Sequence, residues 1–260
     1  MKSGHSAFCA LALWAASSLV FADPVPLDLT ITGKFTVDAV NSWDPTGGAT
    51  QTAVASALNG GVLSQGSFSG SPSALSQGGA LTATGDGVGG LFTMSGTRAG
   101  SDATTQGLFA DYLFTLANGS ATDTYTIFFR AKAVNDASAS GSNAFAHSEL
   151  SVSDALNNEI FFSDELIDTL NPGNNRAAVS ASDLFSFVLA PGQSTTFSAL
   201  QSQLGGAYDD DGNSYSASLD GFLSIDEIRS SATTNGVPSP GTLPLVLTGL
   251  VLLALRPRRR

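Results

Sequence analysis

The sequence predicts an all-β protein: a single antiparallel β-sandwich, flanked by an N-terminal signal peptide and a short C-terminal membrane helix. Three observations favour this fold class. Short stretches of alternating apolar and polar residues recur along the chain, Gly-, Ser- and Asn-containing turn signals separate them, and no long helical pattern occurs between the two ends. Only 13% of the residues are charged, and phenylalanines scattered among small residues favour strands over helices.

The first predicted strand covers residues 27–37, where Leu27, Leu29 and Ile31 alternate with polar residues. Between residues 41 and 107 the alternation weakens, and Gly- and Ser-rich stretches indicate turns between short strands, or mobile loops. Residues 51–58 could form one short helix.

From residue 107 the alternation becomes clear, with one strand over 107–116 and another over 125–133. Between them Asn118-Gly119 predicts a hairpin turn, because both residues tolerate positive φ. Further strands are predicted at 143–153, 157–163, 184–189, 194–200 and 213–226. The last of these has an apolar inner face formed by Tyr215, Ala217, Leu219, Leu223 and Ile225.

Residues 1–22 have the pattern of a secretory signal peptide. Lys2 provides the positive charge, an apolar run follows to Phe21, and Val20 and Ala22 occupy the −3 and −1 positions, so cleavage is expected between Ala22 and Asp23. The alternative is an N-terminal membrane anchor, but the run is short for a span of about 20 residues.

Residues 237–260 form a second targeting segment: a Pro-x-Pro element at 237–240, an apolar helix at 241–255 and a basic tail at 256–260. Leu243 to Leu255 would extend about 20 Å as a helix, against a hydrocarbon core of about 30 Å. The basic tail should remain in the cytoplasm while the upstream chain is exported. Its arginines are Arg256, Arg258, Arg259 and Arg260. A weak span with a strong orientation signal favours a transient intermediate over a permanent anchor.

This C-terminal pattern resembles the PEP-CTERM sorting signal of Gram-negative bacteria. Val237, Pro238, Ser239 and Pro240 stand where members of that family usually read Val-Pro-Glu-Pro, with Ser239 in the place of the glutamate. The resemblance implies processing by exosortase near this motif, and export to a surface, exopolysaccharide or biofilm matrix. The alternative is a plain proline linker before an anchor. Residues 230–236, which are polar, read as a flexible linker to the signal.

The remaining residues, 23–229, are predicted to form one β-sandwich domain. All 22 acidic residues but only six of the 11 basic ones lie between the two targeting segments, which gives a net charge of about −16. Such a chain repels phosphate backbones, so nucleic acid is excluded as a partner. The single cysteine, Cys9, leaves with the signal peptide, so the mature protein has no disulfide, thiolate nucleophile or cysteine metal site.

Three motifs could bind a ligand. Gly85 to Gly90 matches G-x-G-x-x-G, but a strand-like sequence follows it and a glycine turn is the better interpretation. Residues 216–227 fit calcium-loop spacing, but serines occupy two carboxylate positions and the same residues alternate as a strand. Asp209, Asp210 and Asp211 are the better cation candidate, with an ordinary solvated turn as the alternative. Calcium is the one possible cofactor; otherwise none is expected, and the mature domain is predicted to fold without metal.

Catalytic residues are not apparent. His147, the one histidine after the signal peptide, is expected on an outer strand face beside Glu149. Asp164 and Glu165, with Asp168, could supply a carboxylate pair for glycoside hydrolysis, although a solvated acidic strand end is the simpler interpretation.

The leading hypothesis is therefore a non-enzymatic exported surface or matrix protein. A carbohydrate-binding module is an alternative that needs an exposed aromatic platform, for which Trp43 and Tyr112 are candidates. A hydrolase of extracellular polymers is a second alternative, supported only by location.

Overall fold

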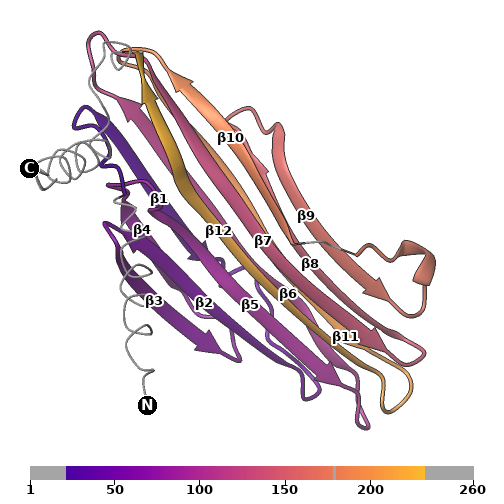
Figure 1. Ribbon diagram of the computed structural model, residues 1–260. Helices are drawn as coiled ribbons and strands as arrows, with labels where there is room; N and C mark the ends of the chain where they lie inside the picture. The colour runs from indigo at the N-terminus through magenta and orange to yellow at the C-terminus, as the bar shows by residue number, and fades with distance from the viewer. Residues whose placement is uncertain (1–21, 178–179, 232–260) are drawn as a thin grey trace, which may run out of the picture.

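The computed structural model describes residues 22–177 and 180–231, and this part of the chain folds into twelve β-strands and one short 3-10 helix. The elements are β1 (Leu29–Val37), β2 (Thr50–Asn59), β3 (Val62–Ser69), β4 (Leu75–Ala80), β5 (Gly87–Thr97), β6 (Ala103–Asn118), β7 (Tyr125–Ser140), β8 (Ala144–Ser153), β9 (Glu159–Asp168), η1 (Pro172–Asn174), β10 (Ala181–Leu189), β11 (Ser194–Ala207) and β12 (Ser214–Ser230). They form two six-stranded antiparallel sheets that stack face to face (Figure 1). The first sheet has the order β4-β1-β6-β11-β8-β9, and the second has the order β10-β7-β12-β5-β2-β3. The predicted all-β class with two packed antiparallel sheets is confirmed.

The inner faces of the long strands are those that the alternation predicted. In β6 the five side chains from Leu108 to Leu116 on one face are all buried, and in β7 the same is true from Tyr125 to Ala133. In β12 the predicted inner residues are also buried, from Tyr215 to Ile225. Strand periodicity therefore determines which residues form the core between the sheets.

Aromatic rings fill one part of this core. Phe114 of β6 stacks on Phe197 of β11 with 4.4 Å between ring centroids, and Phe129 of β7 meets both rings edge-on across the interface. Phe185 and Phe187 of β10 cover the same cluster from the edge of the second sheet. Offset and edge-to-face packing of this kind adds to the free energy gained by burying the rings.

A buried polar bridge crosses the core beside the aromatic cluster. The Tyr112 hydroxyl bonds the Gln201 amide and the Gly221 carbonyl, and Gln201 donates to the carbonyls of Gly90 and Leu219 at 3.0 and 3.1 Å. A side chain at Gly221 would meet the Tyr112 hydroxyl at 2.8 Å. Glycine is needed there because the backbone of one sheet accepts hydrogen bonds from side chains of the other.

One prediction in the N-terminal half is wrong: residues 51–58 are not a helix but lie in β2. The segment from 41 to 107, interpreted as turns between short strands or as mobile loops, holds the four strands β2 to β5 and the start of β6. The inner face of β2 is made of Ala53, Ala55 and Ala57, all fully buried. Because alanine is a strong helix former and the intervening residues include Val54, the period of two was hidden in the sequence.

The predicted hairpin at Asn118-Gly119 is also wrong, since β6 and β7 belong to different sheets. The Asn118 side chain instead donates to the carbonyls of Asp123, Leu189 and Ala190, which ties the β6–β7 connection to the end of β10. The use of asparagine here depends on a strand that lies about 70 residues further on, so a local turn rule could not foresee it.

Other strand boundaries shift. The strands predicted at 157–163, 184–189, 194–200 and 213–226 are longer, as β9 to β12. Leu27, predicted to face inward, lies before β1 and is fully exposed. The last strand runs to Ser230, and the Ser231 N–H donates to the Thr124 carbonyl at 2.9 Å, so the first residues of the expected linker pair with the folded domain.

Candidate functional site

Most residues of the predicted targeting signals lie outside the described part of the chain. This holds for the sorting motif at 237–240, the apolar segment at 241–255, the basic tail at 256–260 and nearly all of the signal peptide. Asp23, expected to follow the first cleavage, is described: its N–H donates to the Thr84 hydroxyl, and its carbonyl accepts from the Thr84 N–H, both at 2.9 Å. Within residues 22–177 and 180–231, no helix is long and apolar enough to cross a membrane.

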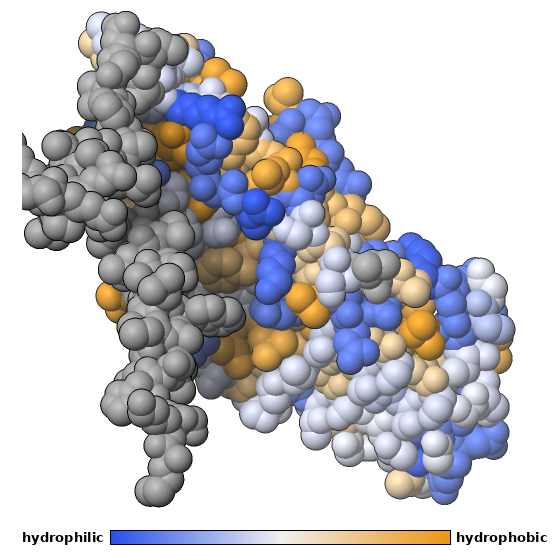
Figure 2. Space-filling model, in the orientation of Figure 1, coloured by the Kyte–Doolittle hydropathy of each residue, from blue (hydrophilic) through white to orange (hydrophobic). Residues whose placement is uncertain are grey.

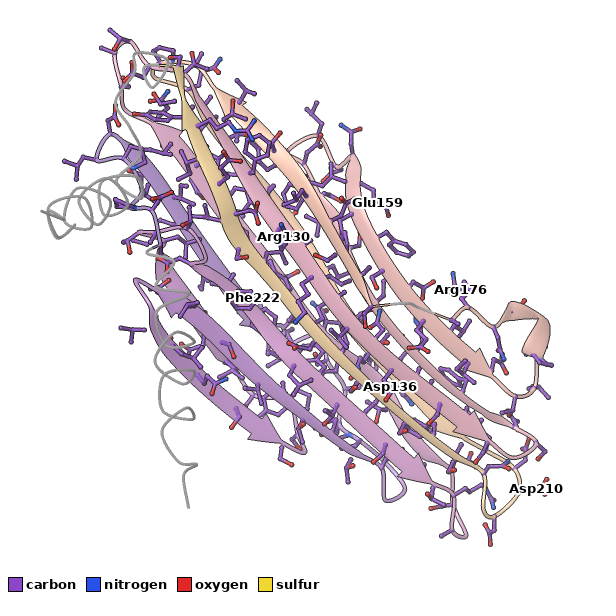
Figure 3. The ribbon with its side chains drawn as sticks, in the orientation of Figure 1. Arg130, Asp136, Glu159, Arg176, Asp210 and Phe222 are labelled. Atoms are coloured by element: carbon purple, nitrogen blue, oxygen red, sulfur yellow. The ribbon has the colours of Figure 1, made fainter. Side chains whose placement is uncertain are left out.

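The acidic turn Asp209 to Asp211 lies in the loop between β11 and β12, at one end of the sandwich where Figure 3 labels Asp210. Its three carboxylates take different partners. Asp209 bonds the Asn143 amide and Asp210 the Ser142 hydroxyl, while Asp211 bonds the Arg98 guanidinium and the Gly100 N–H. Each of the three carboxylates is therefore bonded to a different partner. Among the described residues, they are not a group whose ligand atoms lie close enough to hold one metal ion.

The two other candidate ligand motifs have the simpler structure that was predicted. Gly85 has φ of +87° in a turn and β5 begins at Gly87, while residues 216–227 are part of β12. Between the two glycines, the Asp86 carboxylate accepts hydrogen bonds from the N–H groups of Gly60, Thr82 and Ala83 and from the Thr82 hydroxyl. The motif is therefore an anchored turn leading into a strand.

The proposed carboxylate pair does not form. Asp164 and Glu165 are consecutive in β9, so their side chains point to opposite faces, and Glu165 is buried between the sheets. Asp168 ends the strand and accepts hydrogen bonds from the Leu170 and Asn171 N–H groups of the following turn. The alternative of a solvated strand end is also wrong for Asp164, whose side chain is only 5% exposed.

The aromatic platform expected of a carbohydrate-binding module cannot be built from the two residues suggested. Trp43 is exposed, but Tyr112 is buried in the core as part of the polar bridge. The second sheet instead carries hydroxyl groups on its outer face. One row crosses four strands through Thr50, Ser95, Ser216 and Ser138, with hydroxyl contacts of 3.1 Å at one end and 2.9 Å at the other.

This hydroxyl face, defined as the outward Ser and Thr residues of β2, β5, β12 and β7, includes a shallow groove of about 420 Å³. Figure 2 shows it as a broad pale area of near-neutral hydropathy at the lower right end of the molecule. Polar residues of the groove are Thr50, Ser95, Thr97, Ser138, Ser140, Ser214 and Ser216. The lining of this groove presents hydrogen-bonding groups and contains no charged side chain.

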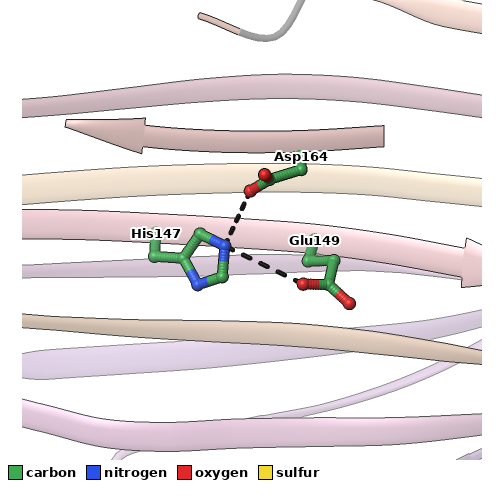
Figure 4. A group of neighbouring side chains, drawn as sticks. All are labelled: His147, Glu149 and Asp164. Atoms are coloured by element: carbon green, nitrogen blue, oxygen red, sulfur yellow. Dashed lines mark hydrogen bonds and ion pairs between the residues drawn. The ribbon is translucent and has the colours of Figure 1, made fainter. Parts of the chain in front are cut away.

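A cluster of ionisable side chains lies on the outer face of the first sheet, and Figure 4 shows its three central members. His147 and Glu149 are two residues apart in β8, so they share a face, as predicted. The register of β8 and β9 places Asp164 directly opposite Glu149. The His147 Nε2 atom lies 2.7 Å from Asp164 Oδ1 and 3.9 Å from Glu149 Oε2.

Arg176 completes this cluster from outside the regular strands. Its backbone makes two hydrogen bonds of 2.8 Å with Leu166 and so pairs with the edge of β9. Figure 3 labels Arg176 at this edge. The guanidinium then lies 2.8 Å from the second oxygen of Asp164. Asp164 is therefore held by His147 on one side and by Arg176 on the other.

Glu149 is the less compensated carboxylate of the cluster. Burial raises its pKa, with His147 and Arg176 acting in the opposite direction and Asp164 and Glu159 adding to the increase. No residue in the described ranges donates a hydrogen bond to it, and its 3.9 Å contact with His147 is too long to be one. Chemically, the cluster offers one imidazole nitrogen and two carboxylate oxygens that could move a proton or hold a cation.

Sequence reasoning found only part of this cluster. Strand alternation placed His147 and Glu149 on one face. It could not identify Asp164 as their neighbour, because the register between β8 and β9 cannot be read from the sequence of either strand. Arg176 follows a 3-10 helix in a connecting segment, and no periodic pattern marks it.

Comparisons with known proteins assign no family. No protein-family profile matches the chain, and no curated protein matches it. Among solved structures, the crystal structure of the infectious bursal disease virus VP2 subviral particle is 7% identical, with 88% of this chain and 73% of that chain covered and a TM-score of 0.15. A structure of the Gx strain of the same virus is 9% identical, with coverage of 90% and 76% and a TM-score of 0.14. Scores this low support no argument about fold or function.

Proposed function

We propose that this chain is an exported bacterial surface or matrix protein whose β-sandwich acts without catalysis. A signal peptide is removed after Ala22, a PEP-CTERM-like signal at Val237 to Pro240 is processed by exosortase, and a membrane helix at 241–255 anchors the chain only in transit. The acidic mature chain is released to the cell surface or to an extracellular matrix rich in polysaccharide.

The observation that supports this proposal is that the described residues nearest to both expected targeting segments are hydrogen-bonded to the sandwich. Asp23, the residue after the expected signal-peptidase cleavage, donates its N–H to the Thr84 hydroxyl, and Pro24 forms a bridge with Ala83. At the other end, Ser231, six positions before Val237, exchanges hydrogen bonds with Thr124. None of the twelve described strands includes a residue of either expected targeting segment, which supports removal of both segments without loss of those strands.

Carbohydrate binding is the second candidate, and the hydroxyl face favours it. Sugar hydroxyls can exchange hydrogen bonds with the paired Ser and Thr groups that line the groove, such as Ser138 and Ser216 at 2.9 Å or Ser140 and Ser214 at 2.8 Å. Co-sedimentation with an insoluble neutral polysaccharide such as cellulose tests it. Binding that is lost in Ser216→Leu, and kept in a matched Ser153→Leu variant on the other sheet, would favour this candidate.

Intact-mass measurement of the exported protein tests the main proposal. The expected mature species begins at Asp23 and lacks Leu243 to Arg260. Replacing Pro238 and Pro240 with alanine should leave the protein membrane-bound and unprocessed, because the recognition element is lost and the span is untouched. Pro191→Ala, in a turn of the domain, is the control and should be processed normally. A mature species that still ends in Arg260 would show that the segment is a permanent anchor.

A further inference from the structure

We propose that His147, Glu149 and Asp164 bind one divalent transition-metal cation of the zinc class on the outer face of the first sheet. The Nε2 atom of His147 and one carboxylate oxygen from each acid are the ligands, and all three atoms lie within 4.8 Å of one another. The site is independent of the export proposal, because it depends only on residues of β8 and β9.

The ligand set selects the class of metal. One imidazole nitrogen with two carboxylate oxygens suits zinc and its neighbours in the first transition row, whereas calcium and magnesium prefer oxygen ligands alone. Three protein ligands leave a fourth tetrahedral position for water or for a group on a partner molecule.

The cluster needs only a small adjustment to accept the ion. His147 Nε2 and Asp164 Oδ1 lie 2.7 Å apart as a hydrogen-bonded pair. Ligands bound at about 2.0–2.1 Å around a tetrahedral zinc lie about 3.3 Å from one another. The two side chains must therefore separate by about half an ångström, and Glu149 Oε2, which lies 3.9 Å from His147 Nε2, must move closer by a similar distance. The imidazole also gives up the proton that it shares with Asp164.

The surroundings are those of a supported site. Arg176 holds the second oxygen of Asp164 at 2.8 Å, which orients the first oxygen toward His147 as outer-sphere partners of metal ligands do. The register places Leu204 of β11 and Leu166 of β9 on either side of His147, both partly buried. Exposed fractions of the His147, Glu149 and Asp164 side chains are 16%, 27% and 5%, so the ligands are shielded but still reachable from solvent.

The charge balance also favours a cation. Two carboxylates face one guanidinium, and no described residue donates a hydrogen bond to Glu149. A divalent ion would compensate the remaining negative charge and give Glu149 a partner. The acidic turn at Asp209 to Asp211 differs in this respect, since each of its carboxylates already has a partner from the protein.

Zinc binding to the full chain, produced without a histidine tag and stripped with EDTA, tests the proposal by titration calorimetry and by metal analysis after dialysis. The expected result is one zinc per chain, with affinity reduced at least about tenfold in both His147→Gln and Glu149→Gln. Asp210→Asn is the matched control that should keep the site. Millimolar calcium should not displace the zinc.

Circular dichroism shows whether each variant is folded. Glu149→Gln, which removes no hydrogen bond made by a described residue, keeps the test valid if His147→Gln misfolds. The proposal is overturned if the wild type retains no zinc, if Glu149→Gln binds it as tightly as the wild type, or if calcium displaces it.

Discussion

Acidic residues of this protein lie either in loops or on strand faces. The two kinds of position differ in how the hydrogen-bond partners of the carboxylate are supplied. In the loops of Asp38 and Asp154 the carboxylate takes its partners from its own turn, whereas Asp209 to Asp211 take theirs from other loops. Asp38 accepts hydrogen bonds from the N–H groups of Val40 and Asn41, and Asp154 accepts them from Leu156 and Asn158. The Asn41 side chain, and then that residue's backbone, lower the pKa of Asp38.

On the outer face of the first sheet the opposite holds. Asp164 is held by His147, 17 residues earlier, and by Arg176, which reaches it after an intervening turn. Glu149 has no hydrogen bond from a described residue, and burial raises its pKa. A turn places its own donors close to its acid, whereas a strand-face acid depends on register, so charge can remain uncompensated there.

The strongest loop case is Asp86, so its loss should have the largest effect. Asp86→Ala removes the acceptor of three N–H groups and one hydroxyl in a site where Asp86 is 2% exposed. We expect a loss of about 3 kcal/mol of unfolding free energy, because buried donors remain unpaired. For a domain of this size the melting temperature should fall by about 6–12 °C. Asp44→Ala, in an exposed loop, is the control and should change little.

The difference in unfolding free energy between wild type and Asp86→Ala should depend on pH, in a direction set by the lowered pKa of Asp86. Burial by itself would raise the pKa of Asp86, but the backbone hydrogen bonds from Gly60, Thr82 and Ala83 outweigh it and leave the pKa below 3.8. A carboxyl with a lowered folded-state pKa stabilises the protein above its unfolded-state pKa and loses that contribution in acid. Urea unfolding should show the full difference between wild type and Asp86→Ala at pH 6 and a smaller one below about pH 4. An unchanged difference at pH 3 would contradict the assignment.

An intermediate loss of stability is expected when the strand-face acid Asp164 is replaced. Asp164→Ala removes the partner of both His147 and Arg176 at a side chain that is 5% exposed, and should cost about 2 kcal/mol in EDTA. The melting temperature should then fall by about 4–8 °C. Glu159→Ala, at an exposed position of the same strand, is the matched control and should stay within about 0.5 kcal/mol of wild type. Equal effects of the two variants would mean that the cluster adds nothing to stability.

The smallest effect should come from the acidic turn. Asp211 pairs with Arg98, but its side chain is 67% exposed, so Asp211→Asn should cost less than about 1 kcal/mol. Because the pair is close to solvent, thermal unfolding in 1 M NaCl should remove the difference from wild type. If Asp211→Asn proved more damaging than Asp164→Ala, the expected order of the buried strand-face acid and the exposed loop acid would be reversed.

The fold was predictable where large apolar residues alternate. Strands β6, β7 and β12 carry such residues on one face, and their inner sides were predicted correctly. Strand β2 was missed because its buried face is alanine, which is equally compatible with a helix. The distribution of strands between the two sheets was not predictable either, and this is why Asn118 was read as a hairpin residue although it anchors a connection between sheets.

Only half of the candidate site could be predicted, because strand alternation reveals which residues share a face but not which strand pairs with it. His147 and Glu149 share a face by periodicity alone, which one strand is enough to reveal. Asp164 joins them only through the pairing of β8 with β9, in which a shift of one residue would have brought Ser163 or Glu165 opposite Glu149. Consecutive acids such as Asp209 to Asp211 attract notice in a sequence, yet here each has found its own partner.

Anomalous scattering from a zinc-soaked crystal, measured at the zinc absorption edge, tests the contrast between the two acidic clusters most directly. The account predicts one strong peak about 2.0–2.2 Å from the ligand atoms of His147, Glu149 and Asp164, and none at the turn of Asp209 to Asp211. A peak at the turn with none at His147 would contradict it, because the cluster that contains Glu149, whose carboxylate accepts no hydrogen bond from a described residue, would then be the one that does not bind the metal.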